Sequence, residues 1–495
     1  MSSLNPAVPH NAAPYPALIL AERLDPTARF ECDCIAPPIE VEHDCRYPSM
    51  PRALAPLYAG RYVQPHGAHV APLPHGFHLV QGPQTTTGPV VLAPGAFDRW
   101  QRFRAPAALR DATDRQLAAL TLLQPLGATP QLCSGPADTL TAWLHVTNAC
   151  NLDCPYCYVR KSSARMSEAT GRLAIEAVFA NATRHGFRTV KLKYAGGEAT
   201  LHFALMRRLH EYAAALSAAT SISLREVVLT NAVHLRPADA DWLAQEQIKV
   251  MISLDGVGEL HNELRPLRNR AGFDTFAAVA HTVDHVLLPR NIRPDVNMVV
   301  TGRNAHGAAD LARWTILERA LPTTFTFYRP NLMSRNRAEL QFEEEALIRG
   351  MLAAYDTVES ELPTWPFTGG LLDRVSAEAR THACGVGQNY LVITHTGALS
   401  QCPMHLGQPV QGDLEGDLLD AVAGGPLLNL PVEQKAGCRD CAFRYRCAGG
   451  CPVETYRATG RWDVQSPNCR LYRTLLPAAL RLEGLRLMKV NGYLH

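Results

Sequence analysis

The chain has 495 residues, and its 48 Lys and Arg residues nearly balance its 46 Asp and Glu residues, leaving a formal net charge of +2. This balance excludes a basic surface that covers the molecule, so we expect no nucleic-acid partner. No apolar run reaches the roughly 18–20 residues that a membrane-spanning helix needs, and the N-terminus lacks a secretory pattern. We therefore expect a cytoplasmic protein of two to four domains with no membrane partner.

Residues 1–138 form the first predicted domain. Its first 75 residues are rich in proline and predict loop and extended chain. Beyond them, short apolar runs predict strands at 77–80 and 90–92, and periodic patterns predict helices at 96–103 and 113–123. We expect a small N-terminal α+β domain of the winged-helix kind.

Residues 139–370 form the second predicted domain, in which strands and helices alternate. Apolar runs predict six strands, at 143–146, 190–194, 227–229, 250–254, 296–300 and 325–328. Helical patterns follow them at 168–183, 203–216, 237–245, 273–287, 305–321 and 343–362. Six such repeats imply parallel strands with right-handed crossovers, an α/β fold resembling a partial (β/α)6 TIM-like barrel. The active site of such a fold lies at the carboxyl ends of the strands.

The loop after the first predicted strand carries Cys150, Cys154 and Cys157 in a Cys-x3-Cys-x2-Cys pattern. In a long chain without an export signal, clustered cysteines indicate metal ligands and not a disulfide framework. Three thiolates at this spacing can bind three irons of a [4Fe–4S] cluster and leave the fourth iron open. Half of a zinc site and unrelated thiols are the alternatives.

This spacing, with Tyr156 before the last cysteine, resembles the radical S-adenosylmethionine (SAM) superfamily. The resemblance implies that the three cysteines hold the cluster that binds SAM. Glu198, after the second strand, completes a segment like the family's Gly-Gly-Glu and is expected to receive the SAM ammonium group. The two glycines before it allow the backbone to approach a ligand.

Further segments resemble the family in strand order. Asn231 follows the third strand, and the Ser253 hydroxyl, after the fourth, is placed to bond the ribose. Arg265 either holds the SAM carboxylate or pairs with a surface acid. The resemblance implies a SAM-binding set made of Tyr156, Gly196, Gly197, Glu198, Asn231, Ser253 and Arg265.

Residues 371–495, the third predicted domain, carry seven cysteines and resemble the SPASM extension of radical enzymes that modify peptides and proteins. The resemblance implies two auxiliary clusters, the first held by Cys384, Cys402 and Cys451 and the second by Cys438, Cys441, Cys447 and Cys469. Two zinc sites are the alternative. Some members of the family place a fourth cysteine a few residues after the first, but residues 385–390 contain none, which leaves an open iron or a non-cysteine ligand, with His382, His395 and His405 nearby.

The resemblance implies a radical SAM peptide maturase with three [4Fe–4S] clusters. Such an enzyme reductively cleaves SAM to a 5′-deoxyadenosyl radical and oxidatively modifies, as by crosslinking, a ribosomally synthesised precursor peptide. A flavodoxin or ferredoxin is the expected electron donor, and no catalytic base can be assigned. An anaerobic sulfatase-maturating (formylglycine-generating) enzyme is the alternative, ranked lower because Pro403 follows Cys402 where those enzymes carry Asp. A non-catalytic metal-binding scaffold is a further alternative.

Two features of the N-terminal part stay open. Residues 76–126 loosely resemble winged-helix units that capture a leader peptide as an added strand, and the alternative is a structural cap on the barrel. Cys32, Cys34 and Cys45 form, with His43, either a zinc site or a group of free thiols.

Overall fold

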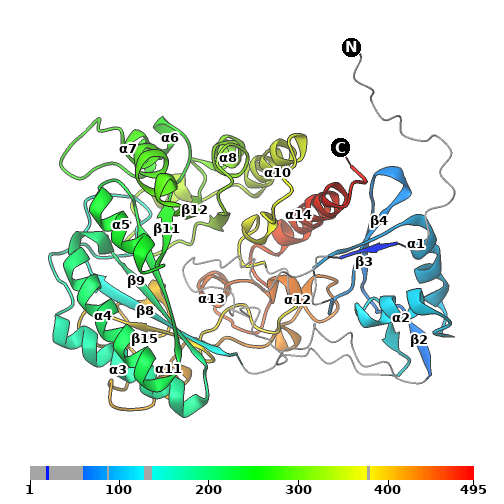
Figure 1. Cartoon of the computed structure of the whole chain (residues 1–495), viewed down its shortest axis with the longest axis horizontal. Coiled ribbons are helices and arrows are strands. Elements are labelled where there is room, and N and C mark those ends of the chain that lie inside the picture. The colour runs from blue at the N-terminus through cyan, green and yellow to red at the C-terminus, as the bar shows by residue number, and fades with distance from the viewer. Residues whose placement is uncertain (1–17, 22–59, 86–87, 128–136, 376–378, 495) are drawn as a thin grey trace.

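The computed structural model describes residues 18–21, 60–85, 88–127, 137–375 and 379–494. The N-terminal unit and the barrel lie at opposite ends of the molecule, with the cysteine-rich C-terminal region between them (Figure 1). Cys32, Cys34 and Cys45 lie outside the described residues, so their role stays a prediction.

The N-terminal unit contains two small antiparallel sheets and two helices. The larger sheet has the order β1-β5-β4-β3, formed by β1 Ile19–Leu20, β3 His69–Pro72, β4 His78–Gln81 and β5 Val90–Leu92. The smaller sheet has the order β6-β2-β7, formed by β2 Arg61–Val63, β6 Ala107–Ala108 and β7 Gln124–Pro125. The helices are α1 Pro94–Gln101 and α2 Ala112–Ala119. Both predicted strands and both predicted helices are present, and β1, β2 and β3 are additional strands in the region predicted as loop and extended chain.

The predicted partial barrel is confirmed as six parallel strands in consecutive order. They are β8 Thr139–Thr147, β9 Thr189–Gly196, β10 Ser223–Thr230, β11 Lys249–Ser253, β12 Asp295–Val300 and β13 Thr323–Phe327. Every residue of β8 and of β13 is buried, as expected for a parallel sheet that is covered on both faces. The apolar runs therefore identified the strands, although the observed strands extend beyond several of the predicted ends.

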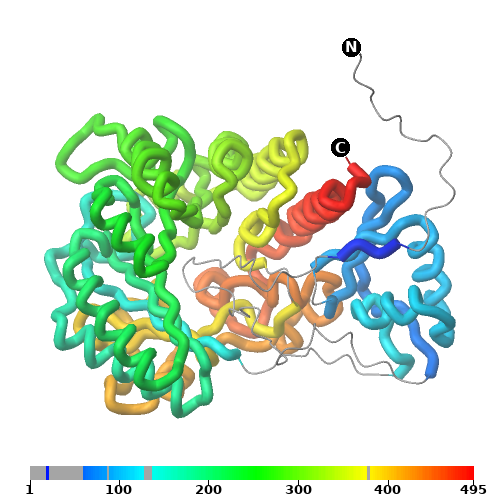
Figure 2. Tube along the Cα trace, in the orientation of Figure 1, coloured from blue at the N-terminus to red at the C-terminus, as the bar shows by residue number. Residues whose placement is uncertain are grey.

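Helices connect these strands, and local capping residues set several of their ends. They are α3 Glu168–His185, α4 Phe203–Thr220, α5 Pro237–Gln245, α6 Glu259–Leu264, α7 Thr275–His281, α8 Ala308–Ala312, α9 Arg337–Leu340 and α10 Glu344–Ser360. Helix α3 begins after Ser167, whose side chain accepts a hydrogen bond from the Thr170 N–H, and ends at Gly186 in the left-handed conformation. The helix predicted at 273–287 continues from α7 as a π-helical turn, and the one at 305–321 consists of a 3-10 turn, α8 and another π-helical turn. In Figures 1 and 2, α3, α4 and α5 lie along the outer side of the sheet.

The sheet does not end at the barrel. Strand β14 Tyr390–Ile393 pairs in parallel with β8, and β15 Leu399–Ser400 pairs with β14 in antiparallel fashion. The eight-stranded sheet therefore crosses the predicted boundary at residue 370, and the first cysteines of the tail are anchored directly beside the first barrel strand.

The remainder of the tail is built from short elements and one long helix. The short helices are α11 Leu418–Ala423, α12 Arg444–Cys447 and α13 Pro452–Thr459, and the long helix is α14 Cys469–Val490. Helix α14 packs against α10 on one side and against β5 of the N-terminal sheet on the other. Gly484 permits the close approach to this sheet, because a Cβ atom there would lie 2.9 Å from Leu79 Cδ1 of β4 and 3.6 Å from Val91 Cγ2 of β5. Helix α14 thus joins all three regions of the molecule.

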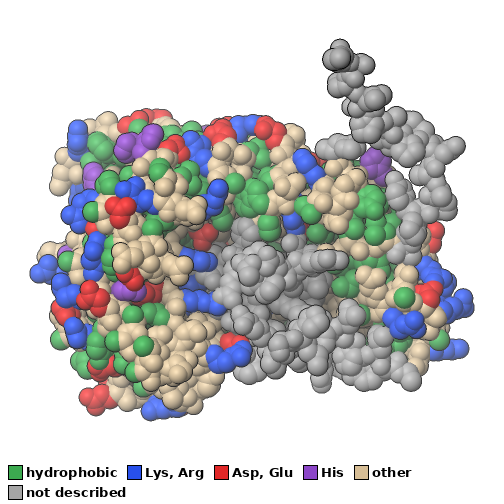
Figure 3. Space-filling model, viewed as in Figure 1, with side chains coloured by type: hydrophobic (Ala, Val, Ile, Leu, Met, Phe, Trp, Pro, Cys, Tyr) green, Lys and Arg blue, Asp and Glu red, His purple; other side chains and the backbone are tan. Residues whose placement is uncertain are grey.

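Acidic and basic side chains are interspersed over the face of the barrel drawn in Figure 3, as the balanced composition predicts. Over the described ranges, we find no helix with the length and hydropathy needed to cross a membrane.

Candidate active site

The cysteine loop begins where β8 ends. The Thr147 side-chain hydroxyl accepts a hydrogen bond from the Ala149 N–H (3.0 Å), which fixes the turn into the loop. Cys150, Cys154 and Cys157 then line one cavity at the carboxyl edge of the sheet. The structure therefore brings the three predicted thiols together at the end of the barrel where catalysis is expected.

The thiols of this loop also interact electrostatically. Burial raises the pKa of Cys154 to about 12, the other two thiols add to this effect, and the Arg265 and Lys161 cations oppose it. In an iron–sulfur cube each thiolate binds a different iron, and three thiols around one cavity are compatible with such a cluster.

Gly196 and Gly197 allow the end of β9 to pack closely against the end of β8 and the start of the cysteine loop. A Cβ atom on Gly196 would lie 2.4 Å from the Thr147 carbonyl oxygen, and one on Gly197 would lie 2.3 Å from the Ala149 carbonyl oxygen. The Gly197 N–H donates to the Thr147 oxygen (2.7 Å). The glycines thus allow the backbone at the start of the cysteine loop to approach closely, and they also line the cavity where they were predicted to admit a ligand.

Glu198 is a buried carboxylate with four donors from the chain. One oxygen accepts bonds from the Thr200 N–H (3.1 Å), the Thr200 hydroxyl (2.7 Å) and the Thr230 hydroxyl (2.8 Å), and the other accepts from the Asn231 N–H (2.7 Å). Burial raises the pKa of Glu198, and these donors counteract the rise. Such a carboxylate on a cavity wall is suited to an ammonium group, which would provide the missing positive charge.

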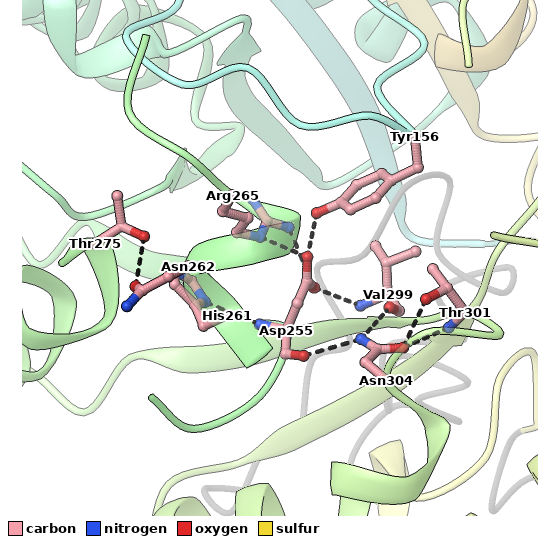
Figure 4. Close-up of polar contacts among 9 residues, drawn as sticks. All are labelled: Tyr156, Asp255, His261, Asn262, Arg265, Thr275, Val299, Thr301 and Asn304. Atoms are coloured by element: carbon pink, nitrogen blue, oxygen red, sulfur yellow. Dashed lines mark hydrogen bonds and ion pairs between the residues drawn. The ribbon is translucent and has the colours of Figure 1, made fainter. Parts of the chain in front are cut away.

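Asp255 anchors a second buried group, drawn in Figure 4. Its carboxylate accepts hydrogen bonds from Arg265 Nε (2.8 Å) and from the Tyr156 hydroxyl. The Arg265 guanidinium carbon lies 5.5 Å from the centre of the Tyr156 ring. Burial lowers the pKa of Arg265, but the adjacent Asp255 carboxylate outweighs this effect and the net pKa is raised. Of the two predicted roles for Arg265, the structure thus shows pairing with an acid, but that acid is buried and not at the surface.

The Asp255 turn is itself held by backbone and side-chain contacts (Figure 4). The Val299 N–H donates to the Asp255 carboxylate (2.9 Å), and the Asn304 amide donates to its carbonyl oxygen (2.9 Å). Buried His261 accepts from the Asp255 N–H (3.2 Å). The group is therefore preorganised by the protein before any ligand binds.

Asn231 and Ser253 complete the predicted SAM-binding set on the cavity wall. The Asn231 side-chain amide donates to Asn151 in the cysteine loop (2.7 Å). Ser253 is the last residue of β11. All seven predicted SAM-binding residues line the same cavity as the cysteine loop.

Electrostatic interactions link tail cysteines within each of the two predicted sets. Cys402 interacts electrostatically with Cys384 and Cys451, whereas Cys438 interacts with Cys441, Cys447 and Cys469. Burial raises the pKa of Cys402 and of Cys438 to about 12, so ligation would have to displace a firmly held proton. The four residues Cys384, Cys402, Cys438 and Cys451 are buried.

Cys402 and Cys451 also line the cavity that contains the Cys150 loop. None of the three histidines named as alternative ligands belongs to the described lining of that cavity. His382 instead hydrogen-bonds to the Thr381 hydroxyl (2.8 Å). The fourth ligand of the first auxiliary set is not assigned by these contacts.

Three charged groups were missed by the sequence analysis, namely Asp255, which is buried behind the cavity wall residue Arg265, and two arginines on the wall itself. Asp255 directly follows a predicted strand, and this position was a usable signal. Arg329 and Arg374 line the cavity, and Asp373 bonds to Arg329 and lies 3.9 Å from Arg374. No local sequence pattern identifies these arginines. Their shared partner, Asp373, is 44 residues from Arg329 and directly precedes Arg374 in a loop. Arg374 has a φ of 55°, an unfavourable value for a residue with a side chain.

Residues 144–314 match the family described as the radical SAM superfamily. The sporulation killing factor maturation protein SkfB of Bacillus subtilis is 25% identical over 319 residues, which cover 62% of this chain and 71% of SkfB. An uncharacterized protein of Methanocaldococcus jannaschii is 27% identical over 190 residues, which cover 38% of this chain and 62% of that protein. Native anSMEcpe with bound AdoMet and Cp18Cys peptide has a similar fold, with a TM-score of 0.59 and 18% identity, covering 70% of this chain and 99% of anSMEcpe.

A partial barrel with a three-cysteine loop at its carboxyl edge and this family match define a radical SAM domain over residues 144–314. The chain is an enzyme that carries this domain, and its cofactors are SAM and [4Fe–4S] iron–sulfur clusters. The converging thiols and the buried Glu198 carboxylate fit these groups, since they provide thiolate ligands and a counter-charge for the SAM ammonium.

Proposed function

We propose that this enzyme is a maturase that oxidatively modifies, by forming a crosslink, a ribosomally synthesised peptide. One observation carries the proposal, namely that the Cys150 loop and the tail residues Cys402 and Cys451 line a single cavity. When bound, SAM and its cluster supply a 5′-deoxyadenosyl radical, and the two auxiliary clusters supply redox groups for a net oxidation. A substrate in the cavity would lie between the SAM site and the first auxiliary set.

The chain's own residues would hold SAM in place. Cys150, Cys154 and Cys157 ligate its cluster, and Glu198 receives its ammonium group. Asn231 and Ser253 are the polar groups available to the rest of SAM at the ends of β10 and β11.

Arg265 acts as a positioning residue in this proposal. Its guanidinium is already committed to Asp255, and that carboxylate in turn receives the Tyr156 hydroxyl. The group therefore fixes Tyr156, which lies between Cys154 and Cys157, and so fixes the shape of the cysteine loop.

The wall of the cavity also protects the reaction. Trp143, Met251 and Phe327 contribute apolar surface to it. A cavity of this composition excludes water and stray hydrogen donors from the reacting carbon.

The N-terminal unit, residues 1–138, is proposed to capture the precursor peptide as an added strand. Strand β1 covers the β5 edge over only two residue pairs, Ile19 with Leu92 and Leu20 with Val91. The opposite edge of this sheet is β3, which pairs only with β4 among the described residues, so its outer edge is available for backbone pairing. Residues 139–370 and 371–495 would be the radical SAM and auxiliary-cluster domains.

The relatives agree with a peptide substrate. The name of SkfB describes maturation of a killing factor, and anSMEcpe was solved with a Cp18Cys peptide. A flavodoxin or ferredoxin is the electron donor that we propose.

The test is the mass of a candidate peptide after anaerobic co-expression with the enzyme and iron–sulfur assembly factors. Short reading frames beside the gene provide the candidates. We expect one peptide to lose two hydrogens per crosslink with the native enzyme and with Cys133→Ala, a control outside every motif, but not with Cys154→Ala. A mass change from Cys or Ser to formylglycine on a sulfatase peptide would instead establish the alternative activity. Unchanged masses of all peptides, with SAM cleavage intact, would contradict the peptide proposal.

A further inference from the structure

Two buried cations lie in the tail without an acidic partner. Lys435 is 2% exposed and Arg380 is 3% exposed. Within the described ranges no carboxylate forms an ion pair with either residue, although most other buried arginines there have one, such as Arg329 with Asp373. Burying a cation without a counter-charge costs free energy, so we expect an anion close to these two side chains in the folded enzyme.

Lys435 is positioned by both cysteine segments of the second set. Its carbonyl oxygen accepts a hydrogen bond from the Cys438 N–H (3.1 Å), and its ammonium donates to the Ala448 carbonyl (3.0 Å), which directly follows Cys447. Gly449 makes room for the side chain, because a Cβ atom there would lie 2.5 Å from Lys435 Cδ and 2.9 Å from its Nζ.

Arg380 enters the same region from the other side. Its N–H donates to the Tyr445 carbonyl (2.9 Å) in the helix that ends at Cys447. Its guanidinium donates to the Arg374 carbonyl, but its Nε and one terminal nitrogen have no described hydrogen-bond partner. Arg380 therefore contacts the segment that carries Cys447 of the second set. It also lies four residues before Cys384 of the first set.

Among the described residues, the acidic groups that interact with these cations are thiols from both sets and, for Arg380, the Tyr472 hydroxyl, while Arg374 opposes the charge of Arg380. Lys435 interacts with Cys384 and Cys451 of the first set and with Cys438 and Cys447 of the second. Arg380 interacts with Cys384 and with Cys447. Free thiols at these buried positions are neutral, whereas cluster-bound thiolates carry charge.

We propose that Lys435 and Arg380, the cation pair, lie between the two auxiliary-cluster sites and raise the reduction potentials of both clusters. The inference rests on the proposed cysteine sets and adds a role that those ligands do not imply. A cluster gains negative charge when it is reduced, so a buried positive charge beside it stabilises the reduced form. The pair thus favours electron transfer from the substrate side into the tail.

The test is a potentiometric titration of the full-length reconstituted enzyme, followed by electron paramagnetic resonance (EPR) without SAM. Lys435→Met and Arg380→Met each remove one charge and retain an unbranched side chain. We expect the reduced-to-oxidised ratio of the auxiliary clusters at a fixed potential to fall roughly tenfold in each variant, which for a one-electron couple is about 59 mV. The SAM cluster should keep its potential.

Lys161→Met is the matched control. Lys161 interacts with Cys150 and Cys154, so its loss should shift the SAM cluster and leave the auxiliary clusters unchanged. If the clusters fail to assemble in Lys435→Met but assemble in Lys435→Arg, this result also supports the requirement for a positive charge at position 435. If neither assembles, Arg380→Met decides the question.

The outcomes separate the inference from the proposed function. Iron analysis of the native enzyme that finds only the SAM cluster would overturn both. Auxiliary clusters that are present but keep their native potentials in Lys435→Met and Arg380→Met would overturn the cation pair alone.

Discussion

The two cysteine regions of this molecule are built in opposite ways. The Cys150 loop is short and is anchored by backbone bonds to a finished scaffold, for example from Asp153 N–H to the Pro266 carbonyl (2.9 Å) and from Arg268 N–H to the Asn151 carbonyl (2.7 Å). The tail cysteines are spread from Cys384 to Cys469 over segments with little regular structure. The Cys150 loop is therefore held by the folded barrel, whereas bound clusters would have to stabilise the segments that carry the tail cysteines.

The hydrophobic clusters show the same difference. The largest one is centred on the barrel strands and their helices and extends into the tail through β14 and α14, where Cys441 and Cys447 pack against it. In the tail, Cys384, Cys402 and Cys451 are themselves core members of a small cluster, and Cys438 forms another with Val432 and Tyr445. Where ligands take the place of core residues, metal binding and folding are coupled.

Removal of the clusters should therefore have the largest effect, and only in the tail. After iron is extracted anaerobically, we expect amide hydrogens between Cys402 and Cys469 to lose most of their protection from exchange, while those of β8–β13 and of β14, which is paired with β8, keep theirs. Hydrogen exchange with mass spectrometry gives both values in one experiment. Equal loss of protection in barrel and tail would remove the distinction between the two regions.

On the barrel side, Asp255→Asn should be the most damaging single change. It leaves the buried Arg265 cation without its partner, which typically costs about 3–5 kcal/mol. Asp284→Asn is the matched control, because Asp284 pairs with Arg319 in a partly exposed ion pair worth about 0–1 kcal/mol. Anaerobic denaturant titration measures both, and similar losses in the two variants would contradict the anchoring role of Asp255.

A smaller effect is expected from Gly197→Ala. The new Cβ atom would meet the Ala149 carbonyl at 2.3 Å, and forced displacement of packed groups costs about 1–3 kcal/mol. We expect the cysteine loop to shift, with lower occupancy of the SAM cluster and normal auxiliary clusters. Gly407→Ala is the control, since nothing lies within 4 Å of a Cβ atom there. Normal iron content in Gly197→Ala, measured by cluster-resolved spectroscopy, would show that the close approach is not needed.

The smallest expected effect concerns a polar group on the outer side of the barrel sheet. Glu226 accepts hydrogen bonds from the Tyr194 hydroxyl (2.6 Å) and pairs with His210 (2.5 Å). The hydrogen bond to Glu226 raises the pKa of His210. The resulting stabilisation is complete below about pH 6.5 and is lost as the pH rises through the raised pKa of the folded state. His210→Gln should thus reduce the unfolding free energy by an amount on the order of 1 kcal/mol at acidic pH, and by less at alkaline pH. A difference that does not vary with pH would contradict this account.

The sequence analysis predicted the barrel well because its determinants are local. Each strand is an apolar run, and the end of α3 carries its own cap at Ser167 and Gly186. The family-like segments after the strands were also found in sequence, and the structure brings all of them to one cavity. The reason is that parallel strands deliver their carboxyl ends to the same edge.

The rest depended on contacts between distant segments. The pairing of β14 with β8 joins residues about 250 positions apart, and it begins with the backbone bond from the Thr141 N–H to the Asn389 carbonyl (2.8 Å). The pairing of Arg265 with a buried acid and the placing of Lys435 beside two cysteine sets are also tertiary facts. In sequence these cations look like ordinary basic residues, because burial and the absence of an acidic partner become visible only in the fold.

The most direct test of the account compares EPR spectra of the reduced enzyme with and without SAM in two variants. We predict that Cys154→Ala loses the signal that responds to SAM and keeps the auxiliary signals. The combined replacement of Cys384, Cys441 and Cys451 by Ala should do the reverse. A SAM-responsive signal that survives in Cys154→Ala, or native auxiliary signals in the triple variant, would contradict the assignment of one catalytic and two auxiliary cluster sites.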